Sequence, residues 1–106
     1  MRPILHGDVV SAARLLLSLP EAMRPRVIDR LLTQADAADR FRKRLRRAHP
    51  VWGNGSLGSA VMHARRGQAR VLPPERFPGD PSYAVCMAAT FEAILRWRLG
   101  QAAMAG

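Results

Sequence analysis

Six of the eight residues from 40 to 47 are positively charged, and this cluster is the strongest candidate for chemistry in the chain. The segment reads RFRKRLRR, and its cations are Arg40, Arg42, Lys43, Arg44, Arg46 and Arg47. Because like charges this close repel one another, a bound polyanion or an acidic partner explains them better than solvent does. Arginine also forms bidentate hydrogen bonds with phosphate. We therefore expect these residues to bind DNA, mostly through phosphates and without sequence choice.

The charge of the whole chain points the same way. The sequence has 17 basic and 8 acidic residues, a formal net charge of +9, and such an imbalance attracts nucleic acid or anionic membrane. A GC-rich genome would also favour arginine over lysine, but it would not cluster the charges. Three further arginines could extend the basic track: Arg65, Arg66 and Arg70. A surface that docks on an acidic protein remains an alternative role for the cluster.

Other reactive residues lack the neighbours that catalysis or metal binding requires. The single Cys86 cannot form an internal disulfide, and together with the scattered His6, His49 and His63 it cannot build a zinc site. No serine or carboxylate pair lies at catalytic spacing from these histidines. The segment GNGSLGS lacks the Gly-Lys-Ser/Thr ending of a P-loop, so we interpret it as a turn and a helix cap. We predict no enzyme activity, no cofactor and no metal.

The two tryptophans could bind a ligand or pack in the core. Trp52 could stack on a base, but a tryptophan in a loop of a small helical protein more often closes the core over a helix end. Trp97 lies between Arg96 and Arg98, as in some membrane-surface anchors, yet the apolar residues around it form an ordinary packing face. No run approaches the ~20 apolar residues that a bilayer span needs, and no signal peptide is evident. We expect a cytoplasmic protein without membrane contact.

The elements that must position the basic cluster are helices. Apolar residues recur at helical spacing in a first segment that follows Asp8, its expected cap, and stops before Pro20. The longest periodic run extends from about Glu21 to Arg47, with Pro25 in its first turn. A helix of this length usually needs a partner along its length.

A helical wheel divides the end of this second helix into an apolar seam and a basic surface. Phe41 and Leu45 lie about 40° apart on the wheel and form the seam. The cations occupy the rest of the circumference. The helix dipole would favour one or two cations at this end, but it does not account for six.

Two more helices complete the predicted fold. Ser56 is expected to cap a third helix, LGSAVMHARR, and residues 67–81 form a connecting loop rich in proline and glycine. Asp80 and Pro81 signal the start of a terminal helix, with Gly100 as its expected C-cap. No alternating strand pattern appears. The chain is therefore predicted to be one small all-α domain, residues 1–106, with about four helices.

A helix-turn-helix interpretation of this pattern is weak. The connection between the second and third helices is longer than the usual turn, and the would-be reading helix begins with glycine-rich sequence instead of base-reading side chains. A small basic helical regulator or nucleoid-type protein that binds DNA as a monomer or dimer remains an alternative function.

Four blocks of the sequence carry a family resemblance: HGDV, ADAADR, HPVWGNGSL and DPSY. With them, nearly the whole chain resembles the small terminases of Rhodobacter-type gene transfer agents, which are phage-like particles. The resemblance implies a DNA-packaging subunit without enzyme activity. Such subunits assemble into homo-oligomeric rings, bind duplex DNA and present it to a large terminase that carries the ATPase and the nuclease.

The resemblance also assigns roles to two parts of the chain. The long second helix would form a helical hairpin that mediates oligomerisation, and the arginine cluster would be the DNA-contacting surface. The chain departs from the fuller phage pattern because it has no clear DNA-reading domain. This departure argues against site-specific binding and suits packaging with little sequence preference.

Overall fold

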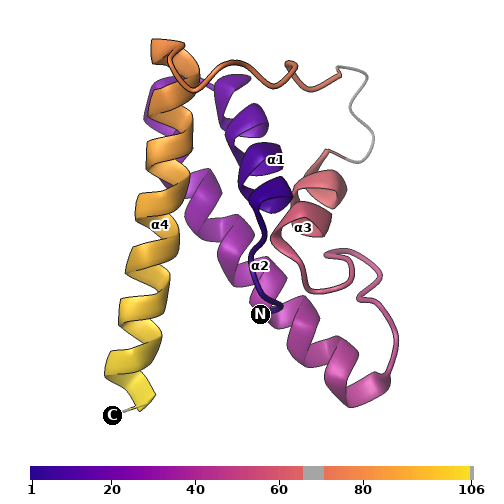
Figure 1. Cartoon of the computed structure of the whole chain (residues 1–106). Helices are drawn as coiled ribbons and strands as arrows, with labels where there is room; N and C mark the ends of the chain where they lie inside the picture. The colour runs from indigo at the N-terminus through magenta and orange to yellow at the C-terminus, as the bar shows by residue number, and fades with distance from the viewer. Residues whose placement is uncertain (66–70, 106) are drawn as a thin grey trace.

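The computed structural model describes residues 1–65 and 71–105, and these residues form a bundle of helices (Figure 1). Its elements are α1 (His6–Leu17), the short 3-10 helix η1 (Glu21–Met23), α2 (Arg24–Leu45), α3 (Leu57–Ala64) and α4 (Pro81–Ala105). No strand forms within these ranges, apart from a single bridge between His49 and Gly53. The prediction of an all-α fold with about four helices is confirmed.

Helix α1 begins earlier than the sequence indicated. Leu5 precedes the helix, and Asp8 is its third residue. The expectation that Asp8 stands before the helix as its cap is therefore wrong. A carboxylate at this position can still satisfy a backbone donor from inside the first turn, and Asp8 Oδ2 accepts a hydrogen bond from Leu5 N at 2.9 Å. Asp8 Oδ1 also accepts from Gly58 N at 3.1 Å, which ties α1 to the start of α3.

Helix α2 has Pro25 in its first turn, as predicted, but it ends two residues before Arg47. Arg46 adopts a left-handed conformation with φ of 58°, and its N–H donates to the carbonyl of Arg42 at 2.7 Å. A left-handed residue directly after a helix satisfies a free carbonyl and turns the chain away from the helix axis. This left-handed residue ends α2.

The caps predicted for α3 and α4 are confirmed. Ser56 Oγ accepts from Ser59 N at 3.1 Å, and Asp80 Oδ1 accepts from Tyr83 N at 3.1 Å. Gly100, however, does not end α4, which continues to Ala105. Glycine inside a helix costs only about 1 kcal/mol relative to alanine, and the next residues, Gln-Ala-Ala-Met-Ala, are good helix formers. At 25 residues α4 is longer than α2, which has 22.

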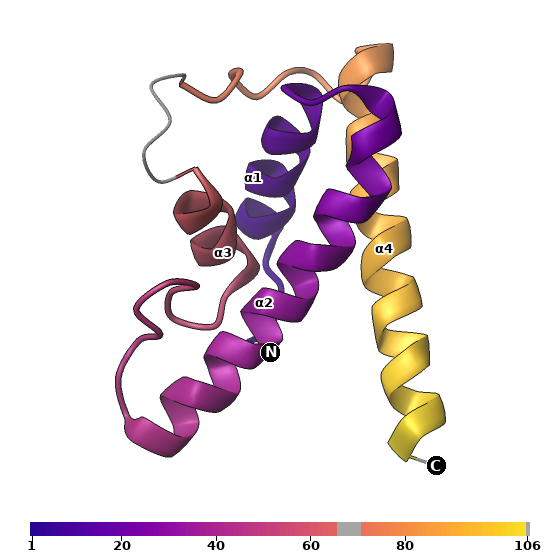
Figure 2. The same ribbon diagram turned by 180° about the vertical axis from the view of Figure 1, so that it is seen from behind.

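The helices pack around one small apolar core. Helix α4 lies along α1, α1 contacts α3, and α2 contacts both α3 and α4 (Figures 1 and 2). The largest fully buried apolar residues are Leu16, Ile28, Leu31, Leu32, Leu57, Val61, Tyr83 and Cys86. Burial raises the pKa of the Cys86 thiol, as expected for a packing residue and not for a nucleophile.

The C-terminal parts of α2 and α4 diverge from the packed middle of the molecule. Both views show the two helices separating toward the end at which each of them stops (Figures 1 and 2). The end of α2 therefore projects into solvent on one side, and the end of α4 projects on another. None of the described helices combines the length and the hydropathy that crossing a bilayer requires.

Candidate nucleic-acid interface

The six cations expected to bind DNA gather at the C-terminal end of α2. Four belong to its last two turns, and two follow directly in the turn that leaves it. All are exposed except Arg42, which is half-buried. The structure therefore presents the cluster as a basic surface, called here the α2 basic end and made of Arg40, Arg42, Lys43, Arg44, Arg46 and Arg47.

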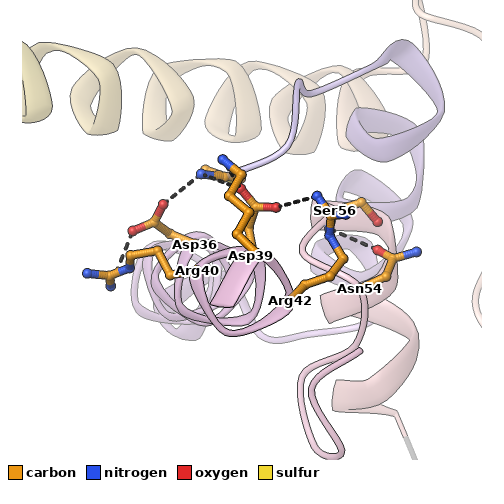
Figure 3. A network of polar contacts seen from close by, with 8 residues as sticks. Asp36, Asp39, Arg40, Arg42, Asn54 and Ser56 are labelled. Atoms are coloured by element: carbon orange, nitrogen blue, oxygen red, sulfur yellow. Dashed lines mark hydrogen bonds and ion pairs between the residues drawn. The ribbon is translucent and has the colours of Figure 1, made fainter. Parts of the chain in front are cut away.

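Two acidic residues one turn earlier neutralise part of this charge (Figure 3). Arg40 lies 3.3 Å from Asp36. Arg42 and Lys43 each lie 3.0 Å from an oxygen of Asp39. Sequence reasoning missed these carboxylates as part of the site, although their spacing of three and four residues from the cations is the helical signal for such pairs. Half of the cluster is therefore already paired within the molecule.

Asp39 is the centre of this network. Its side chain is 0 % exposed, and the amino group of Met1 lies 3.4 Å from Asp39 Oδ2 and 2.7 Å from Asp36 Oδ1. Burial raises the pKa of the Asp39 carboxyl, but interactions with Lys43, Arg42 and the amino group outweigh burial and lower this pKa to about 2. Asp39 therefore stays ionised and fixes the start of the chain against α2.

The other half of the cluster is free of carboxylates. Among the described residues, Arg44 and Arg46 form no ion pair, and Arg47 contacts only a ring, its guanidinium carbon lying 5.9 Å from the centre of Phe41. Exposed guanidinium groups without a carboxylate partner keep their hydrogen-bond donors available for phosphate.

The surface of the α2 basic end is hollowed. A depression of about 520 Å³ is lined by Arg42, Lys43, Arg46, Arg47, Ala48 and Asn54. No carboxylate lines it. The Asn54 side chain comes from the turn before α3 and is held there by a 3.0 Å hydrogen bond from Ser56 N to Oδ1 (Figure 3). Four cations around a concave surface can surround a phosphate group.

An aromatic stack supports the turn after α2. The ring of His49 lies parallel to that of Trp52 at 4.7 Å and edge-on to that of Phe41 at 4.8 Å. His49 Nδ1 also accepts from the backbone N–H groups of Val51 and Trp52, both at 3.1 Å. Trp52 thus closes the chain over the end of a helix, which is the packing role that the sequence favoured.

The predicted apolar seam forms only in part. Phe41 is half-buried beneath His49, whereas the side chain of Leu45 is 45 % exposed. The left-handed Arg46 turns the chain away from the helix immediately after Leu45, so no later element covers that side chain. The expectation that Leu45 belongs to a packed seam is therefore wrong.

The glycines of GNGSLGS serve the turn, as predicted from the sequence. Gly55 has φ of +98°, and a Cβ atom there would lie 2.7 Å from both Cα and Cβ of Asp39. Only glycine permits so close an approach to α2 in this conformation. Gly53, with φ of +88°, is similarly crowded by Ser59. The turn and α3 are thereby held against the helix that carries the cations.

The additional arginines do not extend the basic surface within the described residues. Arg65 is half-buried and directly follows α3. That end of α3 lies far from the C-terminal end of α2 in both views (Figures 1 and 2). Arg66 and Arg70 lie outside the described residues. The candidate interface is therefore the α2 basic end.

The fold and this surface define a small all-α protein with a basic helix end. In the described residues, no group of three or more histidine, cysteine, aspartate or glutamate side chains could hold a metal ion. Over residues 2–94 the sequence matches the family described as "Domain of unknown function (DUF7742)", and the chain belongs to that family. Comparison with curated proteins and with solved structures gives no match.

Proposed function

We propose that this protein is a DNA-packaging adaptor of the small-terminase kind, which binds duplex DNA with little sequence preference and presents it to a large terminase. In this proposal the chain has no catalytic activity and works as a homo-oligomer. The packaging role is supported by the sequence resemblance, which extends over nearly the whole chain. DNA binding is supported by the α2 basic end.

The single observation that carries DNA binding is the concave basic surface beside Asn54. Arg46 and Arg47 line it, and Arg44 adds a further exposed cation close by in the chain. None of these three guanidinium groups is paired with a carboxylate in the described structure. Contacts from such groups go to phosphates and supply affinity but no sequence information.

Low sequence preference is supported by the way α3 is held. This helix has only eight residues, and its N-terminal Leu57 is buried. The next residue, Gly58, donates its N–H to Asp8 of α1 at 3.1 Å. A recognition helix reads base edges with its N-terminal residues, and here that end of the helix is occupied by contacts inside the molecule.

The salt dependence of DNA binding tests whether the α2 basic end contacts DNA. Each phosphate contact contributes about −0.9 to the slope of log K against log salt. Replacing Arg44 and Arg46 by Gln should therefore make the slope shallower by about 2 and weaken binding about tenfold or more at moderate salt. Fluorescence anisotropy with a mixed-sequence duplex across a salt series measures both quantities.

The matched control is a double replacement of Arg26 and Arg30 by Gln. These residues also lie exposed on α2 and form no ion pair in the described structure, but they precede the cluster by several turns. The control removes the same net charge. If both doubles weaken binding equally, only net charge matters, and the assignment of the α2 basic end is wrong.

The adaptor role needs its own test. Purified protein should retain a large terminase in a pull-down without DNA and stimulate its ATPase when DNA is added. A protein that binds DNA but has no effect on the large terminase would instead support the alternative of a small regulator or nucleoid-type protein.

A further inference from the structure

The outward face of α4 is apolar along most of the helix. Its exposed large side chains are Val85 at 51 %, Phe91 at 53 %, Leu95 at 58 % and Leu99 at 61 % exposure. The exposed Ala88 and Ala102 lie on the same side. The opposite side of α4 faces the core, and its buried residues are Tyr83, Cys86, Thr90 and Ala93. A helix with apolar residues on both sides is normally covered on both sides.

The spacing of this face is that of a coiled-coil seam. Residues 85, 88, 92, 95, 99 and 102 alternate steps of three and four, which is the a and d pattern of heptads. All are apolar except Glu92, which occupies one a position. A helix with the same spacing can therefore pack along α4 with its knobs in the holes of this face.

We propose that a second copy of this protein covers the α4 face, with the two α4 helices antiparallel. The charges on the face decide the direction. In a parallel pair, Glu92 would lie opposite Glu92 of the partner subunit, and the two carboxylates would repel each other. Within one chain, Arg96 lies 3.8 Å from Glu92 and 3.3 Å from Asp29. In an antiparallel pair centred near Ala93 and Ile94, each Glu92 also comes close to Arg96 of the partner subunit, because equivalent flanks meet in that arrangement, so each carboxylate has an arginine from both chains beside it.

Side-chain size favours the same arrangement. Antiparallel pairing about this centre places the small Ala88 opposite the large Leu99 of the partner subunit. Large side chains facing small ones fill an interface without voids. The α4 face thus carries both acidic and basic and both large and small side chains. It can therefore be complementary to its own copy, as a two-fold contact requires.

The proposed α4 interface does not include the residues proposed to bind DNA. It places self-association on α4 and not on α2. The resemblance assigned oligomerisation to the long second helix. The exposed positions of α2 are polar or charged except for Pro25 and Leu45, so α4 offers the better surface. A two-fold contact closes on itself, and a ring would need a second, different contact between such pairs.

Solution mass is the first test. Light scattering on the full chain should give the mass of two chains or an even multiple. Replacing Leu95 and Leu99 together by Gln should halve the mass of a pair. As a control, Met62 and Val51, which are exposed apolar residues on α3 and in the turn, are replaced by Gln, and the mass should not change. A monomeric wild type, a double variant of unchanged mass, or a control that dissociates would each overturn the proposal.

Disulfide trapping tests whether the two α4 helices are antiparallel. It does not depend on the glutamine variants. Cys86 is fully buried, and the unmodified protein serves as the background control. A mixture of Ala88→Cys and Leu99→Cys chains should form mixed cross-linked pairs under mild oxidation. Neither variant alone should do so, because like positions would lie about 16 Å apart along the antiparallel helices, too far for a disulfide. Self-pairing of Ala88→Cys, or no cross-link in the mixture, would overturn the antiparallel pair.

Discussion

At the scale of single residues, Asp39 links α2 to the start of the chain. Its carboxylate holds Arg42, Lys43 and the amino group of Met1 around one buried position. Burying an ion is costly unless opposite charges surround it, and here three do. The ion pairs also hold part of the basic cluster in place. Asp39 therefore stabilises the fold and at the same time reduces the charge that the surface presents.

The pH dependence of stability should reveal this role. The pKa of Asp39 is about 2 in the folded protein against an ordinary 3.8. A lowered pKa stabilises the folded state above the unfolded pKa, and this stabilisation is lost as pH falls from about 5 toward 2. The shift corresponds to about 2 kcal/mol. Urea unfolding across this range should show that loss in the wild type.

Asparagine variants separate Asp39 from the other carboxylates. Asp39→Asn should already be destabilised at neutral pH by about 2 kcal/mol or more, because Arg42 and Lys43 lose their carboxylate partner and the amino group of Met1 loses one of its two. It should then lose less stability on acidification than the wild type. Asp29→Asn removes only an exposed ion pair with Arg96, 3.3 Å long, and should stay within about 1 kcal/mol of the wild-type curve. Parallel curves for the wild type and Asp39→Asn would contradict the role of Asp39.

Among the elements, the turn from 46 to 56 positions the interface, and Gly55 packs closely against α2 at Asp39. Alanine at position 55 would place a Cβ 2.7 Å from the Asp39 backbone in a positive-φ conformation. Left-handed strain of about 1–2 kcal/mol and overpacking of about 1–3 kcal/mol add in the same direction. Gly55→Ala should therefore lower the free energy of unfolding by about 2–5 kcal/mol.

The control for this prediction is Gly100→Ala in α4. A Cβ at position 100 meets no atom within 4 Å, and alanine is the better helix former by about 1 kcal/mol. This variant should be slightly more stable than the wild type in the same urea titration. If both substitutions behave alike, the close packing of the turn on α2 is wrong.

The fold could be predicted where the sequence signal was local. The prediction failed where the structure depends on neighbouring residues. Ser56 and Asp80 cap their helices through hydrogen bonds three residues away, so the sequence contained both partners. The exposed Leu45 could not be predicted, because its exposure follows from the left-handed Arg46. The prediction that α4 ends at Gly100 was wrong because the helix formers on both sides of this glycine outweigh its low helix propensity.

The candidate site could also be predicted only in part. The six cations are evident from the sequence, and their pairing with Asp36 and Asp39 could have been read from helical spacing. The approach of Met1 to Asp39 joins residues far apart in the chain and requires the fold. The same is true of Asn54, which reaches the basic hollow only because the turn folds back on α2.

In the whole molecule, the two proposed surfaces have a fixed relation. The C-terminal ends of α2 and α4 lie toward the same end of the molecule in both views (Figures 1 and 2). An antiparallel pair of α4 helices reverses one copy relative to the other. The two α2 basic ends would then lie at opposite ends of the pair, where they face different DNA segments.

This arrangement predicts that the pair bridges two DNA molecules. Wild-type protein should retain a labelled free duplex on beads that carry a second, immobilised duplex. The variant with Leu95 and Leu99 replaced by Gln should bind each duplex with nearly unchanged single-site affinity but lose bridging, because each chain has one basic end. The variant with Arg44 and Arg46 replaced by Gln should lose both binding and bridging while keeping the mass of a pair. Bridging by the Leu95 and Leu99 variant at the wild-type level would show that the two basic ends are not joined through α4.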